Sequence, residues 1–332
     1  MDQRKLIKHT MNDKREIFYA KIMLFGEYSV ICDSMGLTIP YAHFKGELSF
    51  IHEDKYTDLE FAYESNRQLK KYSLYLQKLI DDGELIFEFD LFSFKKDIDK
   101  GLYFESSIPQ GFGIGSSGAL CAALYNEYGL NKIPNSRHVS KKEILNLKKI
   151  FAQLESYFHG VSSGIDPLNC YLKHPIIIHG KADLSTVGIP RNKHDEKGAI
   201  FLINTGHAGM TEPLVNLFFE QCKQHSFYKS IRDEMIPFNN NCIKSLIKGE
   251  TKEFFKNLRG LSKFLLKNME PMIPETFKEI WNIGLDTSTY YLKLCGSGGG
   301  GFLLGFTEDL EKAKFELRKH NVEVIPVYKS AK

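Results

Sequence analysis

The sequence predicts an α+β protein that is large enough for two domains. The chain has 332 residues, of which 42% are hydrophobic and 26% are charged, a balance typical of a protein with a sizeable buried core. Near the N-terminus, an apolar run rich in strand-forming residues at 17–25 ends at Gly26. The C-terminal part indicates several helices followed by strand, loop, strand, helix and strand, which is an α+β order.

The N-terminal half mixes strand and helix patterns. After the first run, further strands are expected at 37–44, 47–52, 84–91 and 175–179. Apolar residues at helical spacing predict helices at 64–79, 117–128 and 141–158. We expect a loop between Gly160 and the strand that begins at position 175. Segment 181–197 is polar, charged and interrupted by proline, which favours an exposed connection to the second half.

We therefore expect an N-terminal domain over 1–190 and a C-terminal domain over 191–332. The C-terminal half opens with a predicted strand at 199–204. Helical patterns follow at 212–224, 231–248, 252–267 and 275–284. The last part predicts a strand at 290–294, a glycine-rich loop at 295–301, a strand at 302–306, a helix at 308–320 and a strand at 322–327.

Composition argues against several classes of function. The formal net charge is only +3 and the lysines are spread along the chain, whereas a nucleic-acid surface usually concentrates them. No apolar run approaches the ~18 residues that span a bilayer, and the N-terminus lacks the apolar core of a signal peptide. The six cysteines are scattered without metal-binding spacing. We therefore expect a cytoplasmic protein with no structural zinc and no nucleic-acid or membrane partner.

Segment 109–120, PQGFGIGSSGAL, is the strongest functional signal in the chain. Its glycines allow backbone N–H groups to approach a ligand closely, and its serines precede a predicted helix whose N-terminus favours anions. The segment therefore predicts a phosphate-binding loop. It is not the P-loop pattern GxxxxGK[ST], because no lysine follows Gly115 or Gly118.

Positions 113–118 also match the dinucleotide pattern GxGxxG, so a nicotinamide-dependent oxidoreductase stays open as an alternative. Pro109 interrupts the segment just before the glycines, and a polar stretch follows the predicted helix. Both features weaken the dinucleotide interpretation. A glycine-rich turn that only caps a core helix is the structural alternative.

Two carboxylates flank a glycine- and serine-rich loop in segment 155–166, ESYFHGVSSGID. Glu155 lies on the last turn of a predicted helix, and Asp166 follows eleven residues later. Such a pair can converge on a metal-bound phosphate, one as Mg²⁺ ligand and the other as base. The alternative is an ordinary helix exit with Gly160 as its C-cap, and His159 by itself is expected to be structural.

Lys21 lies inside an otherwise apolar strand, where an unpaired ammonium group would be costly to desolvate. We expect it either at an exposed edge or beside a carboxylate. Glu27, just after Gly26, fits equally well as a surface turn residue.

Near the C-terminus, glycine occupies five of the six positions of segment 296–301. A loop so rich in glycine predicts a close approach of its backbone to a ligand or to another loop.

The order of these segments resembles that of a known family. Segments 21–30 (KIMLFGEYSV), 109–120 and 296–301 (GSGGGG) resemble the three sequence motifs of the GHMP small-molecule kinase superfamily. HGVSSGID at 159–166 is similar to the HGxPSGxD signature of mevalonate kinases, and KLCGSGGGGF at 293–302 is similar to their KxTGAGGGG segment. The residues that resemble their NT…T..LV pattern are Asn204, Thr205, Thr211, Leu214 and Val215.

The resemblance implies a two-domain α+β fold. Its N-terminal domain would be like ribosomal protein S5 domain 2, and its C-terminal domain would be ferredoxin-like, with ATP and substrate in the cleft between them. The activity implied is the ATP- and Mg²⁺-dependent phosphorylation of mevalonate to 5-phosphomevalonate, in isoprenoid precursor biosynthesis.

The resemblance also implies roles for individual residues. Asp166 would be the general base for the substrate hydroxyl, Lys21 its neighbour, and Glu155 the Mg²⁺-binding carboxylate. Ser116 or Ser117 would supply a second, hydroxyl ligand to the metal. The residues expected to hold ATP are Pro109, Gly111, Gly113, Ile114, Gly115, Ser116, Ser117 and Gly118. The residues expected near the substrate are Glu27, Ser163, Gly164, Thr211, Gly298 and Gly299.

Several departures from the mevalonate kinase patterns leave the substrate open. Tyr28 replaces the usual histidine, and Ile114 and Gly118 replace leucine and alanine; Tyr28 and Gly118 are more like phosphomevalonate kinases. Ser162 replaces the proline of HGxPSG, and Ser297 replaces an alanine. Phosphomevalonate kinase or another small-metabolite kinase is therefore the alternative enzyme. A catalytically inactive regulatory binder is disfavoured because the residues for the chemistry are all present, and a homodimer is compatible with the sequence.

Overall fold

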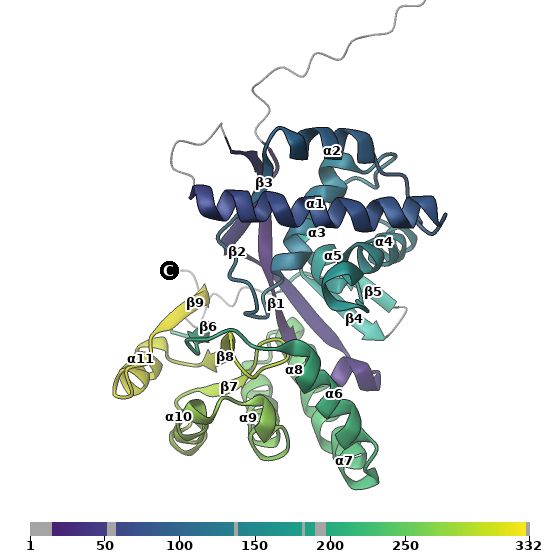
Figure 1. Cartoon of the computed structure of the whole chain (residues 1–332). Coiled ribbons are helices and arrows are strands. Elements are labelled where there is room, and N and C mark those ends of the chain that lie inside the picture. The colour runs from purple at the N-terminus through teal and green to yellow at the C-terminus, as the bar shows by residue number, and fades with distance from the viewer. Residues whose placement is uncertain (1–14, 52–57, 136–138, 181–182, 190–196, 330–332) are drawn as a thin grey trace, which may run out of the picture.

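Two antiparallel sheets organise the part of the chain that the computed structural model describes, which is residues 15–51, 58–135, 139–180, 183–189 and 197–329 (Figure 1). The first sheet contains β1 (Phe18–Phe25), β2 (Gly36–Phe50), β3 (Leu102–Ser106), β4 (Ile176–Gly180) and β5 (Asp183–Thr186). Its order is β1-β2-β4-β5, and β3 also pairs with β2. Because β2 is 15 residues long, its start pairs with β4 and its end pairs with β3.

The helices of this half gather around the first sheet, in the upper part of Figure 1. They are α1 (Leu59–Asp81), α2 (Leu91–Asp99), α3 (Ser116–Tyr128), α4 (Lys141–His159) and α5 (Ile165–Leu172), with a short 3-10 turn η1 (Ser29–Cys32) after β1. The start of α4 is fixed by a reciprocal capping box between Ser140 and Glu143. The chain then leaves α4 and enters α5 through the loop that contains Ser162 and Ser163.

The second sheet has the strand order β7-β8-β6-β9. Its strands are β6 (Ala199–Asn204), β7 (Tyr291–Leu294), β8 (Phe302–Thr307) and β9 (Val324–Lys329). Between β6 and β7 lie α6 (Thr211–Cys222), α7 (His225–Ser230), the π-helical turn η2 (Ile231–Met235), α8 (Ile236–Lys248), α9 (Thr251–Asn268), η3 (Glu270–Met272) and α10 (Glu275–Thr287). One helix, α11 (Leu310–Arg318), connects β8 to β9. With the helices after β6 counted as one connection, this is the βαββαβ pattern of a ferredoxin-like domain.

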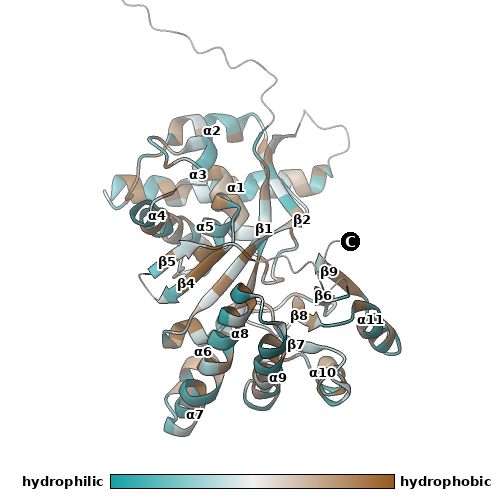
Figure 2. Cartoon of the chain, turned by 180° about the vertical axis from the view of Figure 1, so that it is seen from behind, coloured by the Kyte–Doolittle hydropathy of each residue, from teal (hydrophilic) through white to brown (hydrophobic). Residues whose placement is uncertain are grey.

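Aromatic side chains form much of the core and also join the two sheets. Tyr125 contacts the rings of Phe151 and Tyr171 at centroid distances of 5.2 and 5.3 Å inside the helical layer of the first half. Phe25, at the end of β1, contacts Phe254 and Phe306 of the second half at 5.9 and 5.5 Å. Figure 2 shows hydrophobic residues along β1 and β4, and more hydrophilic residues on outer helices such as α4 and α9. The two halves therefore share a buried apolar contact.

Most of the predicted elements are confirmed, but the strand expected at 84–91 is wrong. This stretch has only an isolated bridge between Phe89 and Gly129, and α2 begins at Leu91, capped by the Asp90 side chain. Phe87 and Phe89 do alternate with polar residues, as in a strand. Their rings instead pack among helices, 5.7 Å from Tyr125 for Phe87 and 5.8 Å from Phe94 for Phe89. The alternation therefore reflects contacts with the helical layer rather than with a sheet.

Three other expectations need correction. The strands expected at 37–44 and 47–52 are one strand, β2, which runs through Gly46 beneath the ring of Phe104; position 52 lies outside the described residues. The loop expected after Gly160 contains α5. The connection expected at 181–197 includes β5 in its described part. The sequence patterns also did not predict α2, β3 and α7.

Among the described residues no helix is both long and apolar enough to cross a membrane.

The entry into α5 depends on a glycine that packs against α4. Gly164 has φ +72°, and a Cβ atom there would lie 2.2 Å from the backbone oxygen of Lys148. Gly160 has a similar φ of +69°, but a Cβ atom there would meet nothing within 4 Å. A side chain at position 160 would therefore meet backbone strain alone, whereas one at position 164 would meet both strain and a collision with α4.

We expect Gly164→Ala to lower the free energy of unfolding by roughly 2 to 4 kcal/mol, because it adds a backbone collision to the strain of positive φ. Gly160→Ala, the control, brings no collision and should cost less, about 1 to 2 kcal/mol of backbone strain. Denaturant-induced unfolding of both variants measures the difference. Equal losses would show that the contact with α4 is not what requires glycine at position 164.

Candidate active site

A cavity of about 1110 Å³ brings together the segments that the sequence singled out. From segment 109–120 it is lined by Pro109, Gly111, Gly113, Gly115, Ser116 and Ser117, and from segment 155–166 by Glu155, His159, Ser162, Ser163 and Asp166. Lys21 and residues of the C-terminal glycine run complete this part of the wall. A second cavity, of about 400 Å³, has a mainly apolar lining and contains none of these residues.

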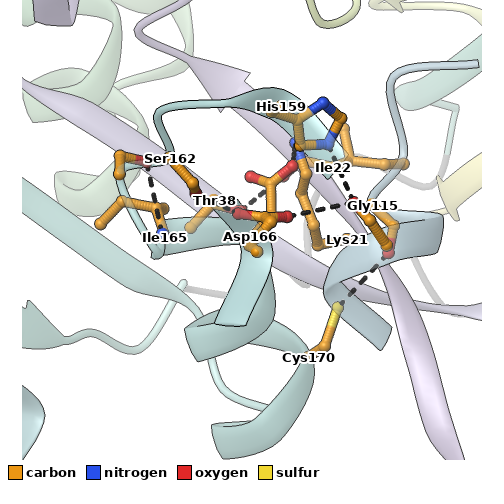
Figure 3. A network of polar contacts seen from close by, with 12 residues as sticks. Lys21, Ile22, Thr38, Gly115, His159, Ser162, Ile165, Asp166 and Cys170 are labelled. Carbon is orange, nitrogen blue, oxygen red and sulfur yellow. Dashed lines mark hydrogen bonds and ion pairs between the residues drawn. The ribbon is translucent and has the colours of Figure 1, made fainter. Parts of the chain in front are cut away.

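Lys21 and Asp166 form an ion pair in this cavity. Lys21 Nζ lies 2.9 Å from Asp166 Oδ2, and the lysine side chain is only 5% exposed (Figure 3). Burial alone lowers the pKa of Lys21, but the charge of Asp166 and its hydrogen bond outweigh burial and raise the pKa above its usual value. Lys21 is therefore a permanent cation with a carboxylate partner, which is one of the two environments expected from the sequence.

Two glycines of segment 109–120 allow this pair to form beside α3. The backbone N–H of Lys21 donates to the oxygen of Ile114 at 2.9 Å, so β1 is bonded directly to the loop. A Cβ atom on Gly115 would lie 2.8 Å from Lys21 Cγ, and one on Gly118 would lie 2.9 Å from the backbone carbon of Asp166. Ile114 itself is buried and contributes through its backbone.

Glu155 is buried on α4 and is held by two serine hydroxyls. Ser117 Oγ donates to its Oε1 at 3.1 Å, and Ser162 Oγ donates to its Oε2 at 2.5 Å. Burial, followed by the nearby charge of Asp166, raises the pKa of Glu155 to about 7, although both hydroxyls and Lys21 act in the opposite direction. Of the two serines left open by the sequence, Ser117 is the one bonded to this carboxylate.

The start of α3 is suited to an anion, and its neighbours are suited to Mg²⁺. Gly115 caps the helix with φ +79°, and free N–H groups at a helix N-terminus attract phosphate. Glu155 and Ser117 supply hard oxygen donors, which Mg²⁺ uses together with water and substrate phosphates. Among the described residues, no cluster of three or more histidine, cysteine, aspartate or glutamate side chains could hold a metal alone. The donors therefore fit a Mg²⁺ ion shared with a nucleotide.

The arrangement around α3 contradicts the dinucleotide alternative. The helix follows β3, which pairs antiparallel with β2 in a wholly antiparallel sheet. A dinucleotide fingerprint instead belongs to the first turn of a parallel βαβ unit. The GxGxxG match is therefore coincidental here.

The C-terminal glycine run contacts the first glycine segment, as its composition predicted. A Cβ atom on Gly113 would lie 2.7 Å from the oxygen of Cys295, and one on Gly301 would lie 2.7 Å from the Cα atom of Phe112. Tyr28 Oη donates to the oxygen of Ser297 at 2.6 Å, which attaches the run to the segment after β1. The two loops therefore form one continuous wall of the cavity.

The residues expected near the substrate do not all face the cavity. Ser163 and Gly298 line it, whereas Gly299 packs against Leu214 and Gly164 against α4. Thr211 begins α6, but its side chain is outside the described residues.

Glu27 lies behind the cavity wall rather than in its lining. It forms a buried ion pair with Lys293, Oε2 to Nζ, at 2.6 Å. Burial raises the pKa of Glu27 although Lys293 opposes this, and its Oε1 has no hydrogen-bond partner among the described residues. The sequence had indicated no partner for Glu27, because Lys293 is remote in the chain.

The contacts of Ser162 and His159 were not apparent from the sequence. Ser162 was noted only as a departure from a family pattern, yet it donates directly to Glu155. His159 was expected to be structural, but its Nε2 lies 3.1 Å from Ser117 Oγ and it lines the cavity. The spacing of Glu155 and His159, four residues apart on a helix, is the one signal that could have indicated a shared face.

Comparisons with known proteins agree with this architecture. Residues 78–173 match the family model described as the GHMP kinases N terminal domain. No curated protein sequence matches the chain. L. major mevalonate kinase, solved in complex with R-mevalonate, has a TM-score of 0.63 at 16% identity, with 97% of this chain and 98% of that chain covered.

Two other solved structures show the same fold over nearly their whole length. Streptococcus pneumoniae phosphomevalonate kinase, in complex with phosphomevalonate and AMPPNP, has a TM-score of 0.58 at 13% identity and covers 95% of this chain and 100% of its own. Lactococcus lactis galactokinase, complexed with galactose, has a TM-score of 0.62 at 16% identity and covers 96% and 94%. Residues 78–173 therefore match the N-terminal domain of GHMP kinases, and the described chain shares the fold of a mevalonate kinase, a phosphomevalonate kinase and a galactokinase.

Proposed function

We propose that this chain transfers the terminal phosphoryl group of ATP to the hydroxyl group of mevalonate. The observation that carries the proposal is the Lys21–Asp166 pair in a cavity that also holds the N-terminus of α3. The match of residues 78–173 to the GHMP kinases N terminal domain supports a small-molecule kinase, and one structural neighbour was solved with the ATP analogue AMPPNP. Under the same proposal the protein is cytoplasmic and acts in isoprenoid precursor synthesis, and a homodimer is its proposed assembly.

The proposed reaction needs few groups because phosphoryl transfer depends mainly on positioning and charge neutralisation. Asp166 would accept the proton of the substrate hydroxyl. The oxygen of that hydroxyl would bond to the γ-phosphorus of ATP while the bond from this phosphorus to the ADP oxygen breaks. Lys21 would offset the negative charge on the transferring group. The N-terminus of α3 would hold the phosphates. Glu155 and Ser117 would hold Mg²⁺, which when bound neutralises phosphate charge.

The charge of the cavity favours an acceptor without a phosphate group. Among the described residues that line it, Lys21 is the only lysine or arginine, whereas Glu64, Glu155 and Asp166 are carboxylates. A phosphorylated acceptor would add about two negative charges beside ATP with no further cation to receive them. This supports mevalonate over phosphomevalonate, which stays the second candidate because Gly26-Glu27-Tyr28 is more like phosphomevalonate kinases.

Asp166→Asn should reduce kcat by roughly 10²- to 10⁴-fold, because the substrate proton loses its acceptor. Binding of ATP, measured by calorimetry, should persist. Asp183→Asn is the matched control, since Asp183 forms an exposed ion pair with Lys141 and neither residue lines the cavity. Near-normal turnover of Asp166→Asn in a coupled ADP assay would remove Asp166 as the base.

Lys21→Met should lower kcat by about 10²-fold or more, because it removes a cation beside the transferring phosphoryl group. The same ADP assay measures it, with a thermal unfolding scan to confirm that the variant is folded. An unchanged kcat would show that Lys21 has a structural role only.

A panel of acceptors decides the substrate. With ATP and Mg²⁺, mevalonate should give the highest kcat/KM among mevalonate, phosphomevalonate, homoserine and galactose. Phosphomevalonate should be at least about tenfold poorer, because its phosphate group would meet no further cation among the described residues that line the cavity. Phosphomevalonate as the best acceptor would overturn the substrate assignment while leaving the kinase assignment intact. Absence of ADP formation with every acceptor would contradict both.

Glu155→Gln should stabilise the protein in the absence of Mg²⁺ and nucleotide. The pKa of Glu155 rises from 4.5 to about 7 on folding, so the folded state binds more protons than the unfolded state between these values. Stability is therefore lost as the pH rises through this window. Denaturation at pH 8 should show a gain of roughly 1 to 3 kcal/mol for the variant, and a smaller gain at pH 5. A gain that is equal at both pH values would contradict this account.

A further inference from the structure

We propose that Ser162 and His159 are positioning residues, which hold the two candidate metal ligands Glu155 and Ser117 for a nucleotide-bound divalent cation. This inference rests on the proposed function and extends it from the ligands to the groups around them. Figure 3 shows His159 above the Lys21–Asp166 pair and Ser162 on the adjoining loop. Neither residue carries the transferred proton.

The hydrogen-bonding capacity of Ser117 is divided in a way that leaves room for a cation. A serine hydroxyl has one proton and two acceptor lone pairs. The proton of Ser117 is directed to Glu155 Oε1 at 3.1 Å, so the contact with His159 Nε2, also 3.1 Å, has the histidine as donor. One lone pair of Ser117 is then left for a metal ion. His159 fixes the direction in which this lone pair points.

Ser162 performs the corresponding task for Glu155. Its hydroxyl donates to Glu155 Oε2 at 2.5 Å and accepts the N–H of Gly164 at 3.0 Å, so the same oxygen connects the carboxylate to the loop before α5. Proline, which the HGxPSGxD pattern has at this position, could make neither contact with its side chain. Each oxygen of Glu155 accepts one hydroxyl proton and keeps further acceptor capacity for a cation.

The two supports approach the ligands from different elements. His159 is the last residue of α4 and lies four residues after Glu155, whereas Ser162 belongs to the loop that continues to Asp166. Together they fix Glu155 and Ser117 relative to each other and relative to the candidate base. Groups that orient metal ligands in this way typically change metal affinity by 10- to 100-fold when removed.

The test measures cation affinity directly rather than turnover. Mn²⁺ binding to the protein in the presence of AMPPNP is titrated by electron paramagnetic resonance, using wild type, Ser162→Ala and His159→Met. Both variants should bind Mn²⁺ roughly 10- to 100-fold more weakly, while the KM for the acceptor stays near that of wild type. Ser156→Ala is the matched control: Ser156 is next to Glu155, but its hydroxyl donates to its own helix at Ala152, and its Mn²⁺ affinity should be unchanged.

A second pair of variants keeps the test decisive if alanine disrupts the fold. Ser162→Thr retains the hydroxyl and should bind Mn²⁺ like wild type, whereas the similarly shaped Ser162→Val should not. In a Glu155→Gln background, the effect of Ser162→Ala should disappear, because Ser162 acts through that carboxylate.

The inference would be overturned if Ser162→Thr and Ser162→Val bound Mn²⁺ equally well, or if Ser162→Ala and His159→Met bound it as tightly as wild type. Kinase activity of the wild type would then still support the proposed function. Failure of wild type itself to bind Mn²⁺ with AMPPNP, or to produce ADP with any acceptor, would overturn the proposed function and this inference with it.

Discussion

The desolvated ammonium group of Lys21 sets the geometry of the site. An unpaired lysine at this depth would cost several kcal/mol, and Asp166 removes that cost by reaching it from the first turn of α5, 2.9 Å away. α3 starts beside both residues, which it can do because Gly115 and Gly118 place no side chain against them. The cation, the candidate base and the N-terminus of α3 are therefore positioned by one packing arrangement.

The second half of the molecule is attached to the same strand. β1 carries Lys21, and two residues after its end Glu27 pairs with Lys293, while Phe25 packs on Phe306. Lys293 stands just before the glycine run that closes the cavity. A buried ion pair is weak evidence of net stabilisation, but removal of one partner leaves an uncompensated charge and is strongly destabilising. The pair therefore fixes how the glycine run approaches the strand that carries Lys21.

Stability and function are opposed at Glu155. The folded protein buries this carboxylate near a second one, which raises its pKa to about 7 and makes the ionised form costly. Ser117 and Ser162 reduce that cost with hydrogen bonds, and in the proposed function a cation would reduce it further. A destabilising buried carboxylate that is supported on both oxygens is typical of a binding site rather than of a core.

The sequence by itself determined most of the local elements, the two glycine-rich loops and the need of Lys21 for a partner, because helix and strand periods and glycine content are readable within a few residues. It also made Asp166 and Glu155 candidates, through their spacing around a glycine- and serine-rich loop and through a resemblance of ordered motifs. Only the tertiary structure decided that Ser117 rather than Ser116 contacts Glu155, that Ser162 and His159 contact Glu155 and Ser117, and that Glu27 faces Lys293. It also showed that 84–91 packs among helices despite its alternating pattern. These outcomes depend on contacts between residues far apart in the chain, and no local period records which distant surface a side chain will meet.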